Sequence, residues 1–464
     1  MKKLLVLAAI GATVLGGSTL PAQTPIADQY RSAANRIVTA ALADSSAWNR
    51  LADMTDKFGS RLSGSEGLER TIDWILVQMK TDGLENVHGE KVMVPHWVRG
   101  DESASLISPR ATPLHMIGLG RSVGTPAGGI TAPVMIVGSF DELTKKAAEA
   151  KGKIVLFDVP FTSYGATVRY RGGAASAAAR VGAVAALIRS VSSYSIQNPH
   201  TGAMNYDSTV KTKIPAAALS VEDALMLHRM IDRGDRVVVN LKMSAQTLPD
   251  APSRNVIAEI RGSEKPDEVV VLGGHIDSWD IGQGAMDDGG GVVAAWEAVK
   301  LIKKLGLKPR RTIRVVAWTN EENGSRGGTG YRDAHRAELD KHVLAMESDN
   351  GVFNVLGLGI TAGAGGLAMA QDMATLLTPI GANKVAEGGS DADTDPLNAL
   401  GVPTISPTVD GTRYFWFHHS SGDTMDKLDP REMAENVAFL AVMAFVAADM
   451  PGYLPRSPIR SEGR

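Results

Sequence analysis

Histidine, aspartate and glutamate residues follow short apolar runs in the C-terminal half of the chain. Three runs end in this way: residues 269–272 precede His275 and Asp277, residues 312–319 precede Glu321 and Glu322, and residues 343–346 precede Asp349. Apolar runs of this kind, alternating with helical segments, are typical of buried strands in a parallel sheet. Because such sheets bind ligands beyond the carboxyl ends of their strands, we expect these side chains to meet at one edge.

A further carboxylate, Asp287, lies in the glycine-rich segment 284–291, between the first two of these runs. A lone aspartate before a helix is most often an N-cap, and residues 292–305 have helical periodicity. The position of Asp287 between two ligand-bearing strand ends favours a metal ligand instead. The glycines permit close approach of the backbone, and the start of a helix helps to keep the carboxylate ionised. An ionised carboxylate can bridge two cations.

The last ligand is expected from the adjacent His418 and His419, which lie in the aromatic and polar segment 414–424. The other histidines stand alone, and we interpret them as structural residues: His88, His96, His115, His200, His228, His335 and His342. The sequence has no cysteine, so any metal must be held by imidazole and carboxylate groups. Two cations held by such ligands, without a thiolate, fit zinc best.

Taken together, these segments resemble the M28 family of metallopeptidases. The motifs have the same order: a Gly-His-x-Asp turn, an Asp before Asp-Gly, a Glu-Glu pair, a later Asp, and a His four residues before Asp-Thr. The resemblance extends from residue 58 to residue 430. It implies a centre with two zinc ions, in which one ion is bound by His275 and Asp349, the other by Glu322 and His419, and both by the bridging Asp287.

The resemblance also implies that Glu321 is the general base for a hydroxide that bridges the two zinc ions and attacks the peptide bond. Asp277 is expected to accept the second ring N–H of His275 and so fix its tautomer. Members of the family commonly have a cis peptide bond after the bridging aspartate, which is the Asp287–Asp288 bond in this chain. These implications assign a role to each residue of the predicted centre.

One position departs from the family pattern. Many members have a tyrosine directly before the last histidine ligand, where its hydroxyl polarises the substrate carbonyl group, but this chain has His418 there. We predict that His418 or Tyr414 performs this task. The loop that contains Ser390 and Asp391 resembles the substrate-side loop of the family, although an ordinary acidic turn explains it equally well.

The pattern of apolar residues predicts an α/β fold with a mostly parallel central sheet flanked by helices, interrupted by an inserted, smaller and β-rich α/β domain. Helical spacing indicates helices over residues 33–52 and 65–80. Short β-type runs occupy residues 101–246, and the segments 182–188 and 214–220 within them resemble the protease-associated domain. No cluster of histidine and acidic residues that could bind a metal occurs in this insertion.

A chain of 464 residues is long enough for two compact units. The predicted division is a signal peptide at 1–22, the first part of the catalytic domain at 23–100, the inserted protease-associated-like domain at 101–246, the zinc peptidase domain at 247–455, and a mobile tail at 456–464. Two lysines followed by an apolar stretch and small residues favour the signal peptide over a buried N-terminal helix. We therefore expect a secreted or periplasmic protein.

The formal net charge of −3 and the absence of basic runs exclude nucleic acid as a partner, and no membrane contact is expected after signal removal. The favoured function is an exopeptidase that hydrolyses dipeptides or the terminal residues of short peptides. Arg171, Arg413 and Asp391 are candidate anchors for the ends of such a substrate. The alternatives are a mononuclear acyltransferase like glutaminyl cyclase, and a non-catalytic binding protein on the same fold. The family resemblance also implies a homodimer.

Overall fold

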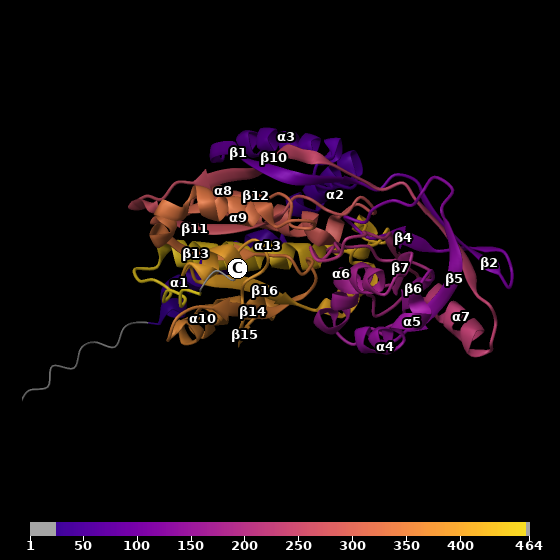
Figure 1. Ribbon diagram of the computed structural model, residues 1–464. Coiled ribbons are helices and arrows are strands. Elements are labelled where there is room, and N and C mark those ends of the chain that lie inside the picture. Colours follow the sequence, from indigo (N-terminus) through magenta and orange to yellow (C-terminus); the bar gives the residue numbers. More distant parts are fainter. Residues whose placement is uncertain (1–24, 461–464) are drawn as a thin grey trace, which may run out of the picture.

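The computed structural model describes residues 25–460, which form two lobes, each built on its own sheet (Figure 1). The strand order of the first sheet is β1-β10-β12-β11-β13-β16-β14-β15. Its strands are β1 (Glu85–Val98), β10 (Gln246–Ile260), β11 (Lys265–His275), β12 (Arg311–Trp318), β13 (His342–Glu347), β14 (Val355–Thr361), β15 (Lys384–Glu387) and β16 (Thr404–Val409). The predicted signal peptide lies outside the described residues.

The four central strands of the first sheet, β12, β11, β13 and β16, run parallel to one another. The outer strands β1, β10 and β14 pair antiparallel with their inner neighbours, whereas the edge strand β15 pairs parallel with β14. Every residue of β12 is buried, as the continuous apolar run in its sequence predicts for a strand covered on both faces. The predicted fold class, an α/β fold with a mostly parallel central sheet, is confirmed.

Helices cover both faces of this sheet and bury its apolar side chains. They are α1 (Ile26–Leu42), α2 (Ser46–Phe58), α3 (Glu66–Thr81), α8 (Gly290–Lys304), α9 (Arg326–Ala334), α10 (Gly366–Ala374), α11 (Asp395–Ala399), α12 (Tyr414–Phe417) and α13 (Pro430–Asp449). The largest apolar cluster joins one sheet face to α1, α2, α8 and α13, and a smaller cluster joins the other face to α9 and α11. The sheet is thus the middle layer of three.

The helix predicted over residues 33–52 is two helices in the structure. The chain turns between α1 and α2, where the Asp44 carboxylate accepts hydrogen bonds from the backbone N–H and the hydroxyl of Ser46, at 2.8 and 2.5 Å. A side chain that binds the free N–H groups of a first turn starts a new helix, although apolar residues continue at helical spacing on either side. The helix predicted over 65–80 is confirmed as α3, with Ser65 as its N-cap.

The second lobe consists of residues 102–243, which we call the inserted unit. Its sheet has the order β3-β2-β9-β5-β6-β7-β8-β4. The elements are β2 (Glu102–Ser108), β3 (Thr112–Leu114), β4 (Met116–Gly118), β5 (Ile130–Val137), α4 (Phe140–Lys145), α5 (Ala147–Ala150), β6 (Ile154–Phe157), α6 (Tyr164–Arg180), β7 (Ala185–Arg189), β8 (Ala216–Leu219), α7 (Val221–Asp232) and β9 (Val238–Met243). The resemblance of this unit to a protease-associated domain stays a prediction.

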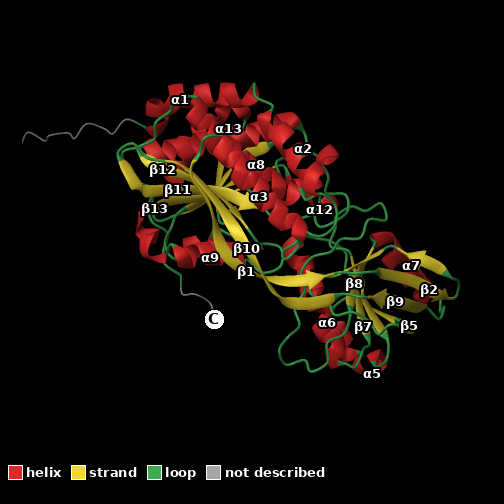
Figure 2. Cartoon of the chain, turned by 90° about the horizontal axis from the view of Figure 1, so that it is seen from above, coloured by secondary structure: helices red, strands yellow, loops and turns green. Residues whose placement is uncertain are grey.

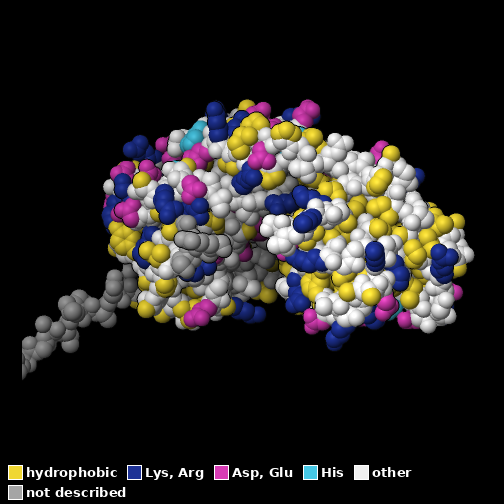
Figure 3. Space-filling view, viewed as in Figure 1, with side chains coloured by type: hydrophobic (Ala, Val, Ile, Leu, Met, Phe, Trp, Pro, Cys, Tyr) yellow, Lys and Arg dark blue, Asp and Glu magenta, His cyan; other side chains and the backbone are white. Residues whose placement is uncertain are grey.

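The inserted unit interrupts the first sheet between β1 and β10, and these two strands form a long antiparallel ribbon that leads from one lobe to the other (Figure 2). The recess between the lobes contains acidic side chains, and Lys and Arg side chains lie along its rim (Figure 3). Helix α12 lies at the junction of the lobes, where its Phe415 ring stacks on Tyr164 of the inserted unit with centroids 4.9 Å apart. The segment with His418 and His419 that follows it contacts both lobes.

The predicted mobile tail begins at residue 456, and the first residues of this segment form hydrogen bonds with the first lobe. The Arg456 guanidinium donates to the carbonyl groups of Leu339 and His342 at 2.9 and 2.7 Å, and the Ser457 hydroxyl donates to the Thr361 carbonyl at 3.0 Å. The mobility of the tail as a whole stays a prediction. Within residues 25–460, no helix combines the length and the apolar character needed to cross a bilayer.

Candidate metal centre

The predicted metal ligands from three strand ends and two later turns come together in the structure. His275 is the last residue of β11, Glu322 follows β12, and Asp349 follows β13. Because these strands are parallel and adjacent, all three side chains emerge at the same edge of the sheet. Asp287 lies in the turn before α8, and His419 lies just after α12.

The carboxylate of Asp287 lies between two pairs of ligands. Its Oδ1 is 3.2 Å from Nε2 of His275, and the same nitrogen is 3.2 Å from Oδ1 of Asp349. Its Oδ2 is 3.3 Å from Nε2 of His419, and that nitrogen is 2.9 Å from Oε2 of Glu322. Ligand atoms about 2.0–2.1 Å from a tetrahedral zinc ion lie about 3.3 Å from one another. The pair of His275 and Asp349, together with Oδ1 of Asp287, therefore has the spacing of a zinc site. On the other side of Asp287, the rings of His418 and His419 both lie close enough to share an ion with its carboxylate, and Glu322 contacts His419.

Two buried oxygens in this cluster have no hydrogen-bond partner, namely Oδ2 of Asp287 and Oε1 of Glu322. Buried polar atoms in folded proteins are nearly always paired, and an unpaired one is costly. Oδ2 of Asp287 already faces the two histidine rings that could share a cation with it. A cation among these side chains would satisfy both oxygens. The residues present thus fit a metal centre.

The pKa shifts show how strongly the groups in the cluster interact. Burial acts to raise the pKa of Asp287, but the neighbouring rings of His275 and His419 lower it well below its usual range. Burial acts to lower the pKa of His419, but the Glu322 and Asp287 carboxylates raise it to about 9. The protonated histidines thus balance the negative charge of these carboxylates. A divalent cation would take over this role, so metal binding must release protons from the histidines.

The predicted contact of the Asp277 carboxylate with the ring of His275 is wrong in its detail. The backbone carbonyl of Asp277 accepts the hydrogen bond from Nδ1 of His275, at 2.9 Å, whereas the carboxylate oxygen is 3.9 Å away. This carbonyl still fixes the tautomer that leaves Nε2 free to bind a metal. The Asp277 carboxylate instead accepts hydrogen bonds from the backbone N–H groups of Glu321 and Glu322, at 3.0 and 3.3 Å. It positions the Glu-Glu pair.

Glu321 lies beside the cluster, on the turn that Asp277 holds. Burial, and after it the charges of Asp349 and Glu322, raise the pKa of Glu321 well above its usual range, although His275 opposes this effect. A carboxyl group with a raised pKa holds a proton readily. A general base needs this property because it takes a proton in one step and returns it in the next. This raised pKa supports the role of Glu321 as general base, which stays a prediction.

Two further aspartates, Asp288 and Asp423, support the bridging residue. The carboxylate of Asp288 accepts from the backbone N–H of His275 at 3.0 Å and from that of Gly291 at 3.1 Å. The carboxylate of Asp423 accepts from the backbone N–H groups of Met286 and Asp287, at 2.7 and 3.2 Å. The Asp287–Asp288 peptide bond is cis, as the family resemblance implies. Asp423 was visible in the sequence only as a polar neighbour of the histidine pair.

A fully buried arginine, Arg61, lies next to the predicted metal centre. Its guanidinium donates to the carbonyl of Ile276 at 2.7 Å, to that of Gln283 at 2.6 Å and to that of Gly284 at 2.8 Å. These carbonyls belong to the segments that follow His275 and precede Asp287, so one side chain ties two ligand-bearing segments together. Residues 58–65 are rich in turn-forming residues and carry no signal of this role, because the partners of Arg61 are backbone groups more than two hundred positions away.

The two residues proposed to polarise the substrate both border the cluster. Nε2 of His418 is 3.4 Å from Oδ2 of Asp287, and the ring of His418 stacks on that of His419 with centroids 3.6 Å apart. Tyr414 is buried, and its ring lies 5.0 Å from the ring of His418. Burial, followed by the charge of Asp287, raises the pKa of Tyr414 well above its usual range. The hydroxyl of Tyr414 therefore remains a proton donor at neutral pH.

The residues predicted to contact substrate do not all lie near the metal centre. Ser390 forms a hydrogen bond with the hydroxyl of Thr404 at 2.7 Å, whereas Oδ2 of Asp391 is buried without a partner. Arg413 donates to Glu432 at 2.8 Å, away from the cluster. Arg171 of the inserted unit is buried, and its Nη1 is 3.2 Å from Nδ1 of His419. Of the three candidate anchors, Arg171 is the one that contacts a predicted ligand.

Comparison with known proteins agrees with this geometry. A family model described as Peptidase family M28 matches residues 255–444, which include the predicted ligands. The chain is also 49% identical over 410 residues to carboxypeptidase Q of Mus musculus, and the alignment covers 88% of this chain and 87% of that protein. The chain belongs to peptidase family M28. The predicted enzyme class, a metalloexopeptidase of this family, is confirmed.

Solved structures of similar proteins extend the match to most of the chain. A peptidase M28 precursor from Shewanella amazonensis is 37% identical and superposes with a TM-score of 0.90, covering 93% of this chain and 99% of that one. A zinc aminopeptidase from Bacillus subtilis, with a TM-score of 0.65, covers 89% of this chain and 97% of that one. Its identity of 20% shows a shared fold and no more. The M28 fold thus accounts for both lobes.

Proposed function

We propose that this M28 peptidase holds two zinc ions and hydrolyses dipeptides or the terminal residues of short peptides. The observation that supports it best is the position of Asp287, whose two carboxylate oxygens face two separate pairs of a histidine and a carboxylate. One ion would be held by His275 and Asp349, the other by Glu322 and His419. The absence of thiolate ligands and the similarity to carboxypeptidase Q favour zinc and an exopeptidase substrate.

The residues around the centre suit peptide hydrolysis. When bound, the zinc ions supply Lewis acidity, which polarises a carbonyl group and lowers the pKa of water at the site. Glu321 accepts the proton of the attacking water and returns it to the leaving amine. Asp277 holds the backbone of Glu321, so the base keeps a fixed position beside Glu322. His418 or Tyr414 donates a hydrogen bond to the carbonyl oxygen as its negative charge develops.

A panel of short peptides tests this function. The zinc-loaded protein is expected to hydrolyse a dipeptide with both ends free, and to lose activity when a chelator removes the metal and regain it when zinc is returned. Versions of the same dipeptide with an acetylated N-terminus or an amidated C-terminus identify the end that the enzyme requires. Activity that survives complete removal of metal would refute the proposal. A ratio of one zinc ion per chain in the active protein would refute the dinuclear centre.

The location and assembly of the protein are part of the same proposal. The basic and apolar start of the sequence supports export to the periplasm or the medium, with cleavage near residue 22. A homodimer is implied by the family resemblance. Mass spectrometry of the mature N-terminus and sedimentation of the purified protein measure these two properties separately from the activity.

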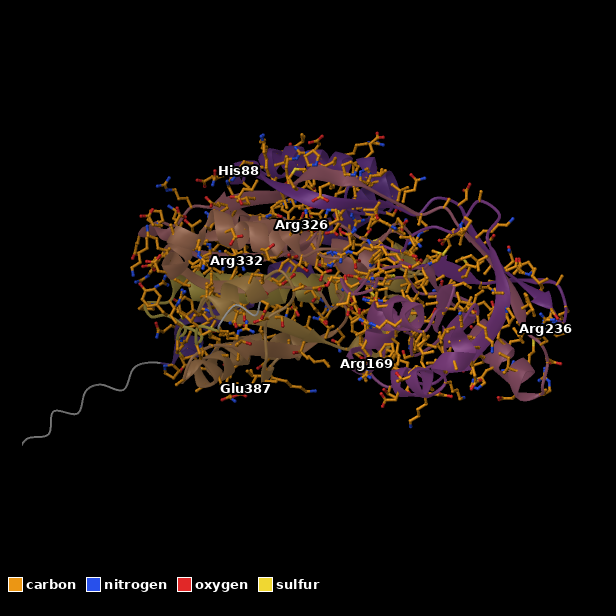
Figure 4. All side chains as sticks on the ribbon, in the orientation of Figure 1. His88, Arg169, Arg236, Arg326, Arg332 and Glu387 are labelled. Atoms are coloured by element: carbon orange, nitrogen blue, oxygen red, sulfur yellow. The ribbon has the colours of Figure 1, made fainter. Side chains whose placement is uncertain are left out.

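Replacement of His418 by alanine is expected to lower kcat by roughly a hundredfold, which is a typical effect of removing one donor to a developing oxyanion. Zinc content should stay unchanged, because His419 is the histidine that lies at 2.9 Å from Glu322. Metal analysis alongside kinetics checks both expectations. The matched control is His88→Ala, on the surface of the first lobe (Figure 4). Loss of zinc from the His418 variant would instead make His418 the ligand.

A further inference from the structure

The turn that carries the last zinc ligand has an unusual backbone conformation. His419 has a φ of +59°, in the left-handed region that side chains other than glycine rarely adopt. Such a conformation costs of order 1–3 kcal/mol and persists only where the surroundings hold it in place. The groups that hold the backbone carbonyls of His418 and His419 belong to the inserted unit, not to the lobe that contains these residues.

A short segment of the inserted unit, residues 198–201, binds this turn at three successive positions. Nδ1 of His200 donates to the His418 carbonyl at 2.6 Å, and the backbone N–H of Thr201 donates to the His419 carbonyl at 2.8 Å. The side-chain amide of Asn198 donates to the hydroxyl of Ser420 at 2.6 Å. Each residue from 418 to 420 is thus held by a separate donor.

The segment 198–201 is itself fixed within the inserted unit. The backbone N–H of His200 donates to the hydroxyl of Ser190 at 2.9 Å, and this hydroxyl donates to the Leu219 carbonyl in β8 at 2.7 Å. The hydroxyl of Thr201 donates to the Gly118 carbonyl in β4 at 2.7 Å. Because these side chains are buried, water does not compete for their hydrogen bonds. The segment can therefore impose a fixed position on the turn.

The ring of His200 is suited to this single contact. A carbonyl group only accepts, so Nδ1 must carry the proton. Burial lowers the pKa of His200 to about 4, which leaves the ring neutral at neutral pH. Its Nε2 is buried and has no partner, which is a cost that an apolar side chain would avoid. The hydrogen bond to the His418 carbonyl thus explains why position 200 holds a histidine and not an apolar residue.

We infer that His200 is a positioning residue for the metal centre, and that the inserted unit sets the affinity for zinc by holding the turn that carries His419. The inference rests on the proposed function, in which His419 binds zinc. It gives the insertion a role in the centre itself, although no residue of the insertion is a predicted ligand. Residues that orient ligands in this way typically change metal affinity by 10–100-fold when they are mutated.

Two substitutions of His200 separate positioning from packing. The amide nitrogen of asparagine lies near the place of Nδ1 and can still donate to the His418 carbonyl, whereas the longer side chain of glutamine places its amide nearer the position of Nε2. His200→Gln is expected to weaken zinc binding at least tenfold in a competition titration with a chromogenic chelator. His200→Asn should restore most of this affinity. The visible absorption bands of the cobalt-loaded protein should shift in the Gln variant and return in the Asn variant.

The matched control is His115→Gln, an exposed histidine of the inserted unit that faces Asp223, which should bind zinc as the unchanged protein does. Wild-type zinc affinity in a folded His200→Gln variant would overturn the inference, and so would equal losses in the Gln and Asn variants. If the Gln variant does not fold, Asn198→Ala decides instead, because it removes a contact on the partly exposed side of the segment. This variant should weaken zinc binding several-fold. Wild-type zinc affinity in the Asn198 variant would count against the inference. A His419→Ala variant with unchanged affinity would refute the ligand assignment instead.

Discussion

Glutamine in place of Glu321 is expected to lower kcat by about a thousandfold, within the range of 10²–10⁴ that general acid–base catalysis contributes. The amide has the size of the carboxyl group but can neither accept the proton of the attacking water nor return it to the leaving amine. Because Glu321 is not a proposed ligand, the zinc content should equal that of the unchanged protein. Steady-state kinetics with a free dipeptide, together with metal analysis of the same preparation, measures both quantities.

The control for this variant is Glu387→Gln, which changes an exposed glutamate at the end of β15, on the periphery of the first lobe (Figure 4). It should keep full activity. A Glu321→Gln variant with nearly normal kcat would assign the base to another residue. One that loses zinc as well would mean that Glu321 is itself a ligand, and the roles of the Glu-Glu pair would have to be exchanged.

Asparagine in place of Asp287 is expected to abolish activity by removing metal. The amide oxygen of asparagine carries no charge, and the amide nitrogen cannot bind a cation. The variant therefore lacks the carboxylate that faces both His275 and His419 and would bridge two ions. We expect the zinc content to fall from two ions per chain to one or none. Each lost site also removes a stabilising ligand, worth roughly 4 kcal/mol at a thousandfold excess of zinc over its Kd, so Tm should fall and respond less to added zinc.

Metal analysis after dialysis and thermal unfolding with and without zinc measure these effects. Asp141→Asn, an exposed position in α4 of the inserted unit, is the matched control and should bind zinc normally. Retention of two tightly bound ions by the Asp287 variant would contradict the bridging role. In that case the turn before α8 would hold Asp287 as an ordinary start of a helix.

The sheet edge with its ligands could be predicted from the sequence because the signals are local. A buried strand is a run of apolar residues, and a polar residue directly after it must lie at the edge of the sheet. His275 and Glu322 follow from this pattern, and Asp287 follows from its place between them. The break between α1 and α2 was missed for the opposite reason, because the apolar spacing continues on both sides of Asp44.

The supporting residues could not be predicted in the same way. Arg61, Asp423 and His200 act on backbone groups that are far away in the sequence, and a contact with a carbonyl or an N–H leaves no pattern of side-chain types. The role of Asp277 shows the same limit. Its nearness to His275 was evident from the spacing, but whether its carbonyl or its carboxylate meets the ring depends on the turn geometry. An isolated histidine such as His200 carries no signal that separates positioning from packing.

The ends of the inserted unit are adjacent, since Glu102 at the start of β2 is paired in register with Met243 at the end of β9. This pairing has a consequence for the order of folding. Once the insertion has folded, the start of the long connection between β1 and β10 is already beside its end, so most of the entropic cost of closing that loop has been met. The two strands can then pair from Val98 and Gln246 outward. The folded inserted unit thereby brings β10, which is synthesised after it, next to β1, which is synthesised before it.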